Sequence, residues 1–191
     1  DRMGLVSNDA KFIPTDQYMI IIIRDIINKV NKKEFLYDVK CSKSLSDEIE
    51  KLGAKGLCYR TGNSYTKAKV RDEDLPFGGE LSGHVYFRDR WLGFDSGLYA
   101  GLRILEILSK TDKNVLELLS GINKYFSTEE LKFKSSDDVK FDVEATLQNS
   151  KKVVESILER HIYKHNDELK RIGEQANKII DSVLSEPEVL E

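Results

Sequence analysis

The sequence contains few of the residues that mark specialised protein classes. Among 191 residues there are two cysteines, three prolines and one tryptophan. A secreted scaffold held by disulfides is therefore excluded, and a reducing cytoplasm is the expected compartment. Neither sign of charge predominates, because 30 basic side chains stand against 33 acidic ones. Without a basic run interleaved with aromatic residues, we expect no nucleic-acid partner.

Long hydrophobic runs are also missing. The most apolar stretch, residues 19–27, is interrupted by Arg24 and Asp25, whereas about 20 apolar residues are needed to cross a bilayer. We therefore expect no membrane partner. The opening residues 1–4 have neither the features of a signal peptide nor an initiator methionine, so we expect a piece of a larger protein. With 40% hydrophobic residues, the composition is that of a globular domain and part of a second one.

Alternating strand and helix patterns predict an α/β fold, in which a mixed sheet is layered with helices. A hairpin is expected over residues 3–13. Helices are expected over residues 16–30, 44–52, 63–70, 96–109 and 115–122. Strands are expected over residues 34–40, 57–60 and 80–87. Asp95 is the expected N-cap of the helix over 96–109.

The C-terminal part has a different character. Residues 128–133 fit a strand, and from residue 139 onward the sequence favours charged helices. A narrow apolar seam with alternating three- and four-residue spacing predicts a partner surface or self-association through the last helix; it comprises Leu169, Ile172, Ala176, Ile179 and Val183. His161 and His165 lie one helical turn apart, but the Glu of a zinc-protease motif is missing, and we interpret them as a solvated face.

The segment 78–84 (GGELSGH) is the most informative for chemistry. In an extended backbone, Glu80, Ser82 and His84 share one face, and Leu81 and Val85 share the other. We therefore expect an exposed polar triplet above buried apolar residues. A carboxylate beside a hydroxyl can hold adjacent sugar hydroxyls, and histidine can exchange protons near neutral pH. The alternative is an edge strand with an ordinary solvated face.

Other catalytic interpretations are weaker. Ser82 lacks the G-x-S-x-G context of a hydrolase nucleophile, and no Asp is placed by its spacing to orient His84. Residues 61–64 follow a strand and open a helix, whose free N–H groups can hold an anion, although an ordinary N-cap explains them equally well. Cys41 and Cys58 are expected to be small core residues rather than nucleophiles.

Four motifs together resemble the third domain of the α-D-phosphohexomutases, in the phosphomannomutase/phosphoglucomutase branch. They are DVKCS at 38–42, RTGNSYTKAKV at 60–70, GGELSGHVYFRDRWLGFDSG at 78–97 and the following LYAGLRILEILS. The resemblance covers about residues 1–149. It implies the end of a preceding domain at 1–11, α/β domain III at 12–123 and a partial domain IV with a C-terminal helix at 124–191.

The resemblance also implies an activity. Members of this family interconvert hexose 1-phosphates and hexose 6-phosphates through a phosphoserine, with Mg²⁺ as cofactor and glucose 1,6-bisphosphate as intermediate and activator. The loop with the phosphorylated serine and the loop that grips the substrate phosphate have no counterpart in this sequence. We therefore expect this chain to supply sugar recognition and to be inactive alone, completed by other domains of the same protein.

Individual roles are carried over by the same resemblance. Glu80 and Ser82 would bind the O3 and O4 hydroxyls of the sugar, and Lys40 and His84 would lie near the reacting hydroxyl as catalytic groups. Because Glu80 is expected to be exposed, its replacement by Gln should affect catalysis more than folding.

The remaining positions complete the implied site. Thr61, Gly62 and Asn63 would form a substrate-binding loop, with Asn63 where many relatives have histidine. Asp1 would be the last of three aspartates that hold Mg²⁺. Two alternatives stay open, a phosphoglucosamine-type mutase and a non-enzymatic α/β module for protein association.

Overall fold

The computed structural model describes residues 1–125 and Lys178. The chain divides into two compact units, Asp1–Thr128 and Glu129–Glu191, and the fold below is that of the first. The strand predicted at 128–133, the seam from Leu169 to Val183, and His161 and His165 lie outside the described residues.

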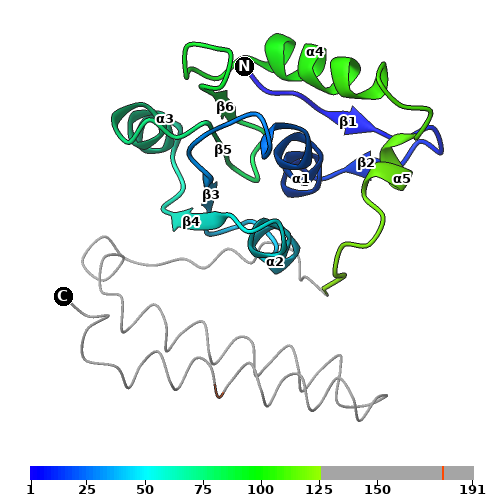
Figure 1. Cartoon of the computed structure of the whole chain (residues 1–191), viewed down its shortest axis with the longest axis horizontal. Coiled ribbons are helices and arrows are strands. Elements are labelled where there is room, and N and C mark those ends of the chain that lie inside the picture. Colours follow the sequence, from blue (N-terminus) through cyan, green and yellow to red (C-terminus); the bar gives the residue numbers. More distant parts are fainter. Residues whose placement is uncertain (126–177, 179–191) are drawn as a thin grey trace, which may run out of the picture. The chain divides into compact units, whose positions relative to one another are not determined.

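A four-stranded mixed sheet forms the centre of the first unit (Figure 1). Its strands are β3 (Glu34–Asp38), β4 (Lys55–Tyr59), β5 (Phe77–Gly79) and β6 (Val85–Phe87). Their spatial order is β4-β3-β5-β6, where β3 is parallel to β4 and β5 and the last pair is antiparallel. The predicted α/β class with a mixed sheet is confirmed for this unit.

Helices cover both faces of the sheet. They are α1 (Thr15–Ile26), α2 (Lys43–Lys51), α3 (Asn63–Asp72), α4 (Gly97–Leu108) and the short α5 (Val115–Leu118). From β3 the chain passes through α2 to β4 on one side, then through α3 back across β3 to β5 on the other. Crossovers that run in opposite directions place their helices on opposite faces, as Figure 1 shows for α2 and α3.

Neighbouring residues of β3 pack alternately against the two faces of the sheet. Phe35 belongs to the larger apolar cluster, which includes α1, α2 and α4. Leu36 belongs to a smaller cluster with Val70 of α3 and Tyr86 of β6. This alternation follows from the pleat of a strand, and it shows that both faces of β3 are buried.

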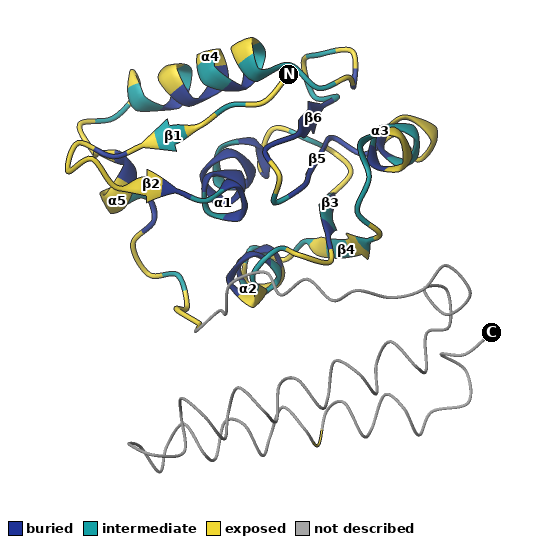
Figure 2. Cartoon of the chain, turned by 180° about the vertical axis from the view of Figure 1, so that it is seen from behind, coloured by how far each residue is buried: buried dark blue, intermediate teal, exposed yellow. Residues whose placement is uncertain are grey.

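Helix α1 is buried more completely than its sequence pattern predicts. One buried face was expected, but four consecutive residues, Ile20 to Ile23, are each at most 3% exposed (Figure 2). The helix contacts α2, α4 and β5, so apolar neighbours surround it. It also ends at Ile26 instead of residue 30. In the described part of the chain, no helix has the length and apolarity to span a membrane.

The chain on either side of the sheet follows the predictions with two changes. The N-terminal hairpin is formed by β1 (Leu5–Val6) and β2 (Phe12–Ile13), paired antiparallel. Helix α4 is capped by Ser96, whose hydroxyl accepts from the Tyr99 N–H, so the predicted cap Asp95 was wrong. Helix α5 ends at Leu118, four residues before the predicted end.

The strand predicted over 80–87 is in fact a turn followed by a short strand. Residues 80–84 connect the antiparallel strands β5 and β6, and the Glu80 N–H donates to the His84 carbonyl at 2.8 Å. Gly83 has a φ of 103°, a conformation that glycine adopts without strain. A turn does not alternate its side chains, so the shared face inferred for this segment does not form.

Candidate active site at the carboxyl ends of β3, β4 and β5

Three loops meet at one edge of the sheet because they leave parallel strands at their carboxyl ends. Asp38, at the end of β3 and 1% exposed, joins all three. Its Oδ1 accepts from the Leu81 N–H at 3.0 Å, and its Oδ2 accepts from the Thr61 hydroxyl at 2.9 Å. In open α/β sheets ligands bind at this edge, where the strand order reverses. Sequence analysis had not assigned a role to Asp38.

Glu80 lies inside the protein, not on its surface. It is 2% exposed, and its Oε1 accepts from the Thr66 hydroxyl at 2.6 Å and from the Gly62 N–H at 3.2 Å. Helix α3 has no side-chain cap of its own. The carboxylate therefore accepts hydrogen bonds at the N-terminal end of α3 although it belongs to another loop. Negative charge is favourable at the N-terminus of a helix. The expectation that Glu80 is exposed was wrong.

The rest of the turn is divided between solvent and interior. Ser82 is exposed and its hydroxyl donates to Glu80 Oε2 at 3.2 Å. Leu81 is half-buried instead of buried, Val85 is buried as predicted, and His84 is 7% exposed, contrary to the expected polar outer face. The oxygens Glu80 Oε2 and Ser82 Oγ thus lie within hydrogen-bond distance of each other, and Ser82 is exposed to solvent.

His84 does have an acidic partner. Its Nδ1 lies 2.7 Å from Asp95 Oδ2, and the side-chain amide nitrogen of Asn63 lies 2.9 Å from the same oxygen. Partial burial favours the neutral acid, but the hydrogen bonds from His84 and Asn63 outweigh it, so the pKa of Asp95 is lowered. The statement that no Asp orients His84 was therefore wrong, because a bridge between Tyr86 and Asp95 brings the two segments together.

Asp1 completes a cluster with His84 and Asp95, whose possible ligand atoms all lie within 4.8 Å of one another. Mg²⁺ prefers six oxygen ligands in near-octahedral geometry. Within the described residues this cluster offers two carboxylates and one ring nitrogen, and Asp95 Oδ2 already faces two donors. These residues do not fit a complete magnesium site, although Asp1 could supply one oxygen to it.

The turn after β3 carries two further residues named from the sequence. Lys40 is exposed there, at the same end of the sheet. Cys41 donates its thiol hydrogen to Asp38 Oδ1 at 3.1 Å. Burial, reinforced by the charge of Asp38, raises the pKa of the Cys41 thiol. A protonated thiol is a poor nucleophile, which agrees with a packing role for Cys41. Cys58 is exposed on β4, so the expectation that it is a core residue was wrong.

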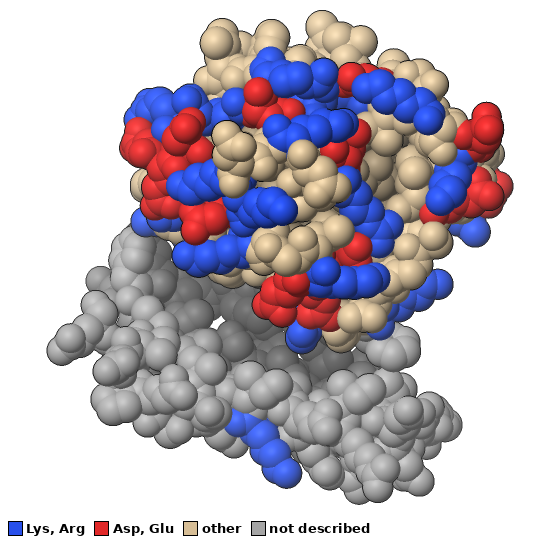
Figure 3. Space-filling model, viewed as in Figure 1, with Lys and Arg blue, Asp and Glu red and all other residues tan. Residues whose placement is uncertain are grey.

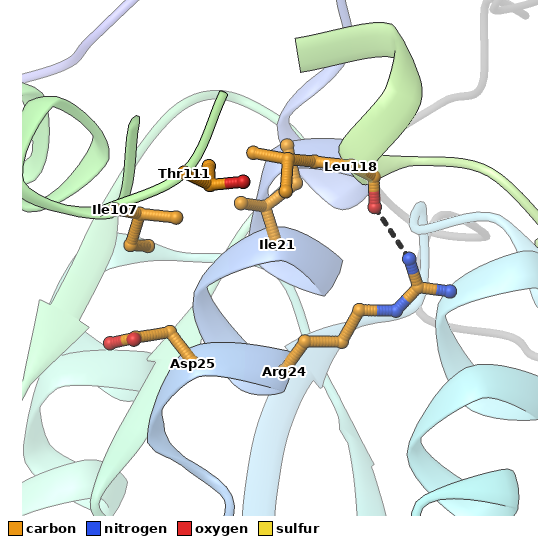
Figure 4. A pocket seen from close by; sticks show the side chains of 6 residues that line it. All are labelled: Ile21, Arg24, Asp25, Ile107, Thr111 and Leu118. Carbon is orange, nitrogen blue, oxygen red and sulfur yellow. Dashed lines mark hydrogen bonds between the residues drawn. The ribbon is translucent and has the colours of Figure 1, made fainter. Parts of the chain in front are cut away.

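The described surface also carries a hollow away from this end of the sheet. A hollow of about 220 Å³ is lined by residues of α1, α4, α5 and the loop between the last two; Figure 4 labels Ile21, Arg24, Asp25, Ile107, Thr111 and Leu118. Arg24 there donates to the Leu118 carbonyl near the end of α5, which is a helix-end contact. On the face shown in Figure 3, basic and acidic side chains are interspersed. The residues around Asp38, Glu80 and His84 form the candidate site, because three loops meet there.

Comparisons with known proteins agree with the α/β fold. Residues 14–125 match the family described as phosphoglucomutase/phosphomannomutase, alpha/beta/alpha domain III. A phosphomannomutase/phosphoglucomutase of Pseudomonas putida is 34% identical over 148 residues, which are 78% of this chain and 32% of that protein. A phosphoglucomutase of Neisseria gonorrhoeae is 38% identical over 131 residues, covering 69% of this chain and 28% of its own length.

A solved structure of a family member has the same fold. The crystal structure of a phosphoglucomutase/phosphomannomutase family protein from Burkholderia thailandensis superimposes with a TM-score of 0.67 at 36% identity, covering 78% of this chain and 31% of that one. The fold is an α/β domain with a candidate ligand site at the carboxyl ends of its parallel strands. The chain belongs to the phosphoglucomutase/phosphomannomutase family and contains its domain III. It spans about a third of the length of the curated relatives it matches.

Proposed function

We propose that this chain supplies the sugar-recognition and proton-transfer part of a hexose-phosphate mutase active site. The observation that carries the proposal is the convergence of Glu80, Ser82 and His84 with the 61–63 loop at one sheet edge. The complete enzyme would interconvert hexose 1-phosphates and 6-phosphates through a phosphoserine and a glucose 1,6-bisphosphate intermediate. Such a reaction depends on positioning the incoming hydroxyl toward the phosphoryl group.

Within the turn, Glu80 and Ser82 would bind neighbouring hydroxyls of the sugar. Glu80 Oε1 is occupied by Thr66 and Gly62, so Oε2 is the oxygen left to accept from a sugar hydroxyl. The Ser82 hydroxyl donates to that oxygen and keeps acceptor capacity for the neighbouring sugar hydroxyl. One carboxylate oxygen and one hydroxyl oxygen can thus serve O3 and O4 of a hexose.

The remaining residues would act on the reacting end of the sugar. His84, held by Asp95, would exchange a proton with the sugar hydroxyl that attacks or leaves. Lys40 would add positive charge near the phosphoryl oxygens, and Thr61, Gly62 and Asn63 would line the substrate. Asp1 would contribute one oxygen to Mg²⁺, which neutralises phosphoryl charge when bound; the other ligands would come from outside the described residues.

The proposal is tested by thermal unfolding of the 191-residue chain with sugar phosphates. A ligand that binds the native state raises its Tm. We expect glucose 1-phosphate or mannose 1-phosphate to raise the Tm, and glucose or inorganic phosphate alone to raise it less. A preference for glucosamine 1-phosphate would instead support the phosphoglucosamine-type alternative. No response to any sugar phosphate, with concentration-dependent oligomers, would support the association module.

A further inference from the structure

Two donors at the start of helix α3 bind the same oxygen of Glu80. The Thr66 hydroxyl donates to Oε1 at 2.6 Å, and the Gly62 N–H donates to it at 3.2 Å. The Thr66 N–H in turn donates to the Gly62 carbonyl at 3.0 Å, which closes the first turn of the helix. Both donors therefore belong to one hydrogen-bonded helical turn, and their spacing does not depend on the 80–84 turn.

The Thr66 hydroxyl is the closer of the two donors. A separation of 2.6 Å is typical of a charge-assisted bond between a hydroxyl and a carboxylate, which is stronger than a bond between neutral groups. Thr66 and Glu80 are 1% and 2% exposed, so water has little access to either side chain. A hydroxyl has a single hydrogen, and Thr66 gives it to Glu80. This bond is therefore a strong restraint on the position of Oε1.

A carboxylate is planar, so holding one of its oxygens also restricts the other. The last torsion of a glutamate side chain has broad minima, and its value is set by the donors around the carboxylate. Rotation of the Glu80 carboxylate would break the bond from Thr66. With that bond made, Oε2 keeps the direction in which it accepts from the Ser82 hydroxyl at 3.2 Å. Ser82 is exposed, so Oε2 is the oxygen on the side of an exposed residue.

We infer that Thr66 is a positioning residue that fixes the orientation of the Glu80 carboxylate, so that Oε2 is the oxygen presented to the hydroxyls of a sugar. The inference rests on the proposed function for the identity of the ligand. Thr66 itself would not contact the sugar, because it is buried beneath Glu80 in helix α3. Its effect on binding would pass through the direction of one acceptor oxygen.

The orientation of the carboxylate can be measured without any ligand. Valine has nearly the same shape as threonine but has no hydroxyl. We therefore expect a crystal structure of the Thr66→Val chain to show the Glu80 carboxylate turned or in several orientations. Thr66→Ser keeps the hydroxyl and should keep the wild-type orientation. A Thr66→Val chain in which Glu80 is unchanged and Oε2 is still bonded to Ser82 would overturn the inference.

The wild-type chain supplies a second measurement, which is needed if Thr66→Val does not fold. The hydrogen of a buried, bonded hydroxyl exchanges slowly with water and can be observed by ¹H NMR. We expect a slowly exchanging Thr66 hydroxyl hydrogen that is coupled across the hydrogen bond to the carboxylate carbon of Glu80. A Thr66 hydroxyl that exchanges freely with solvent would contradict the inference.

Sugar binding separates a positioning role from a general loss of structure. We would measure the Kd of each 191-residue chain for glucose 1-phosphate and for its 3,4-dideoxy analogue, which lacks the two hydroxyls assigned to Glu80 and Ser82. Thr66→Val should weaken binding of glucose 1-phosphate by about five-fold, as for one lost hydrogen bond, and binding of the analogue by less than about two-fold. Thr66→Ser should bind both ligands like the wild type. Equal losses for the two ligands would overturn the inference.

Thr111→Val is the matched control, because it makes the same change in the hollow between α1, α4 and α5. It should leave both affinities unchanged, and a loss as large as that of Thr66→Val would also contradict the inference. If the wild-type chain binds no sugar phosphate, the proposed function fails. The orientation of Glu80 in the ligand-free chains then decides the role of Thr66 by itself.

Discussion

The Oε1 of Glu80 lies 2.6 Å from the hydroxyl of Thr66, which links the 80–84 turn to the first turns of α3. Both side chains are buried, at 2% and 1% exposure. A carboxylate with this little solvent depends on protein donors for its stability. Glu80 is therefore part of the structure of the site as well as a candidate contact for substrate.

Replacing Glu80 by Gln should reduce the stability of the chain. The neutral amide keeps acceptor capacity for Thr66 and Gly62 but loses the charge-assisted part of these bonds, a loss of about 1.5–3 kcal/mol in the free energy of unfolding. Urea denaturation measures it. Glu73→Gln is the matched control, since Glu73 is exposed near the end of α3 and should change stability by less than about 0.5 kcal/mol. Equal effects of the two variants would show that burial of Glu80 does not matter.

Asp47 should make the stability of the unit depend on acid pH. The neighbouring Lys43, with Tyr125 and Asn123, lowers the pKa of Asp47 to about 2. Because the folded pKa lies below the unfolded value of about 3.9, the contribution is present above about pH 4 and is lost as the pH falls toward about 2.

The Asp47→Asn variant tests this dependence. Urea unfolding of both proteins at several pH values should show the wild type more stable near neutral pH and the difference shrinking through the acid window. A difference that stays constant down to the lowest pH at which the chain folds would exclude the Asp47 ion pair as its cause.

The two cysteines should differ in reactivity. Burial and the charge of Asp38 raise the pKa of both thiols, but Cys41 also donates to Asp38, whereas Cys58 is exposed on β4. Under native conditions iodoacetamide should label Cys58 first and Cys41 only after unfolding. Peptide mass spectrometry distinguishes the sites, and Cys58→Ser should leave the native chain almost unlabelled. Equal labelling of both cysteines in the native chain would mean that the loop around Asp38 opens readily.

The 191-residue chain alone is expected not to interconvert glucose 1-phosphate and glucose 6-phosphate. It matches domain III and about a third of its relatives' length, and a phosphoryl relay needs the phosphoserine that the resemblance places elsewhere. A coupled assay with Mg²⁺ and glucose 1,6-bisphosphate measures turnover, with the Pseudomonas putida relative as the positive control. Mg²⁺-dependent turnover by the purified chain would contradict this expectation.

The sequence predicts most of the helices and strands because their signals are local. Helix α2 has a serine before it and a glycine after it, and α3 begins where the strand pattern of β4 ends. The 80–84 turn was not predicted, because its alternating polar residues also fit a strand. The strand before it, β5, is only three residues long. Local pattern cannot distinguish these two conformations.

The residue types of the candidate site could be predicted from the sequence, but the contacts between these residues could not. Glu80 and His84 were found, but Glu80 is held by Thr66, 14 positions away, and His84 by Asp95, 11 positions away. Asp38 binds the Leu81 N–H from 43 positions away. The parallel arrangement of β3, β4 and β5 brings these residues together. Spacing within one segment carries no information about such contacts.

The central claim is that this sheet edge recognises a hexose phosphate, and ¹H–¹⁵N NMR titration of the 191-residue chain with glucose 1-phosphate tests it most directly. The account predicts saturable shift changes confined to residues 61–63, 80–84 and the turn after β3. Affinity should fall by about five-fold in Ser82→Ala, for one lost hydrogen bond, and remain unchanged in the exposed control Ser109→Ala. Shift changes centred elsewhere, or a Ser82→Ala chain that binds as tightly as wild type, would contradict it.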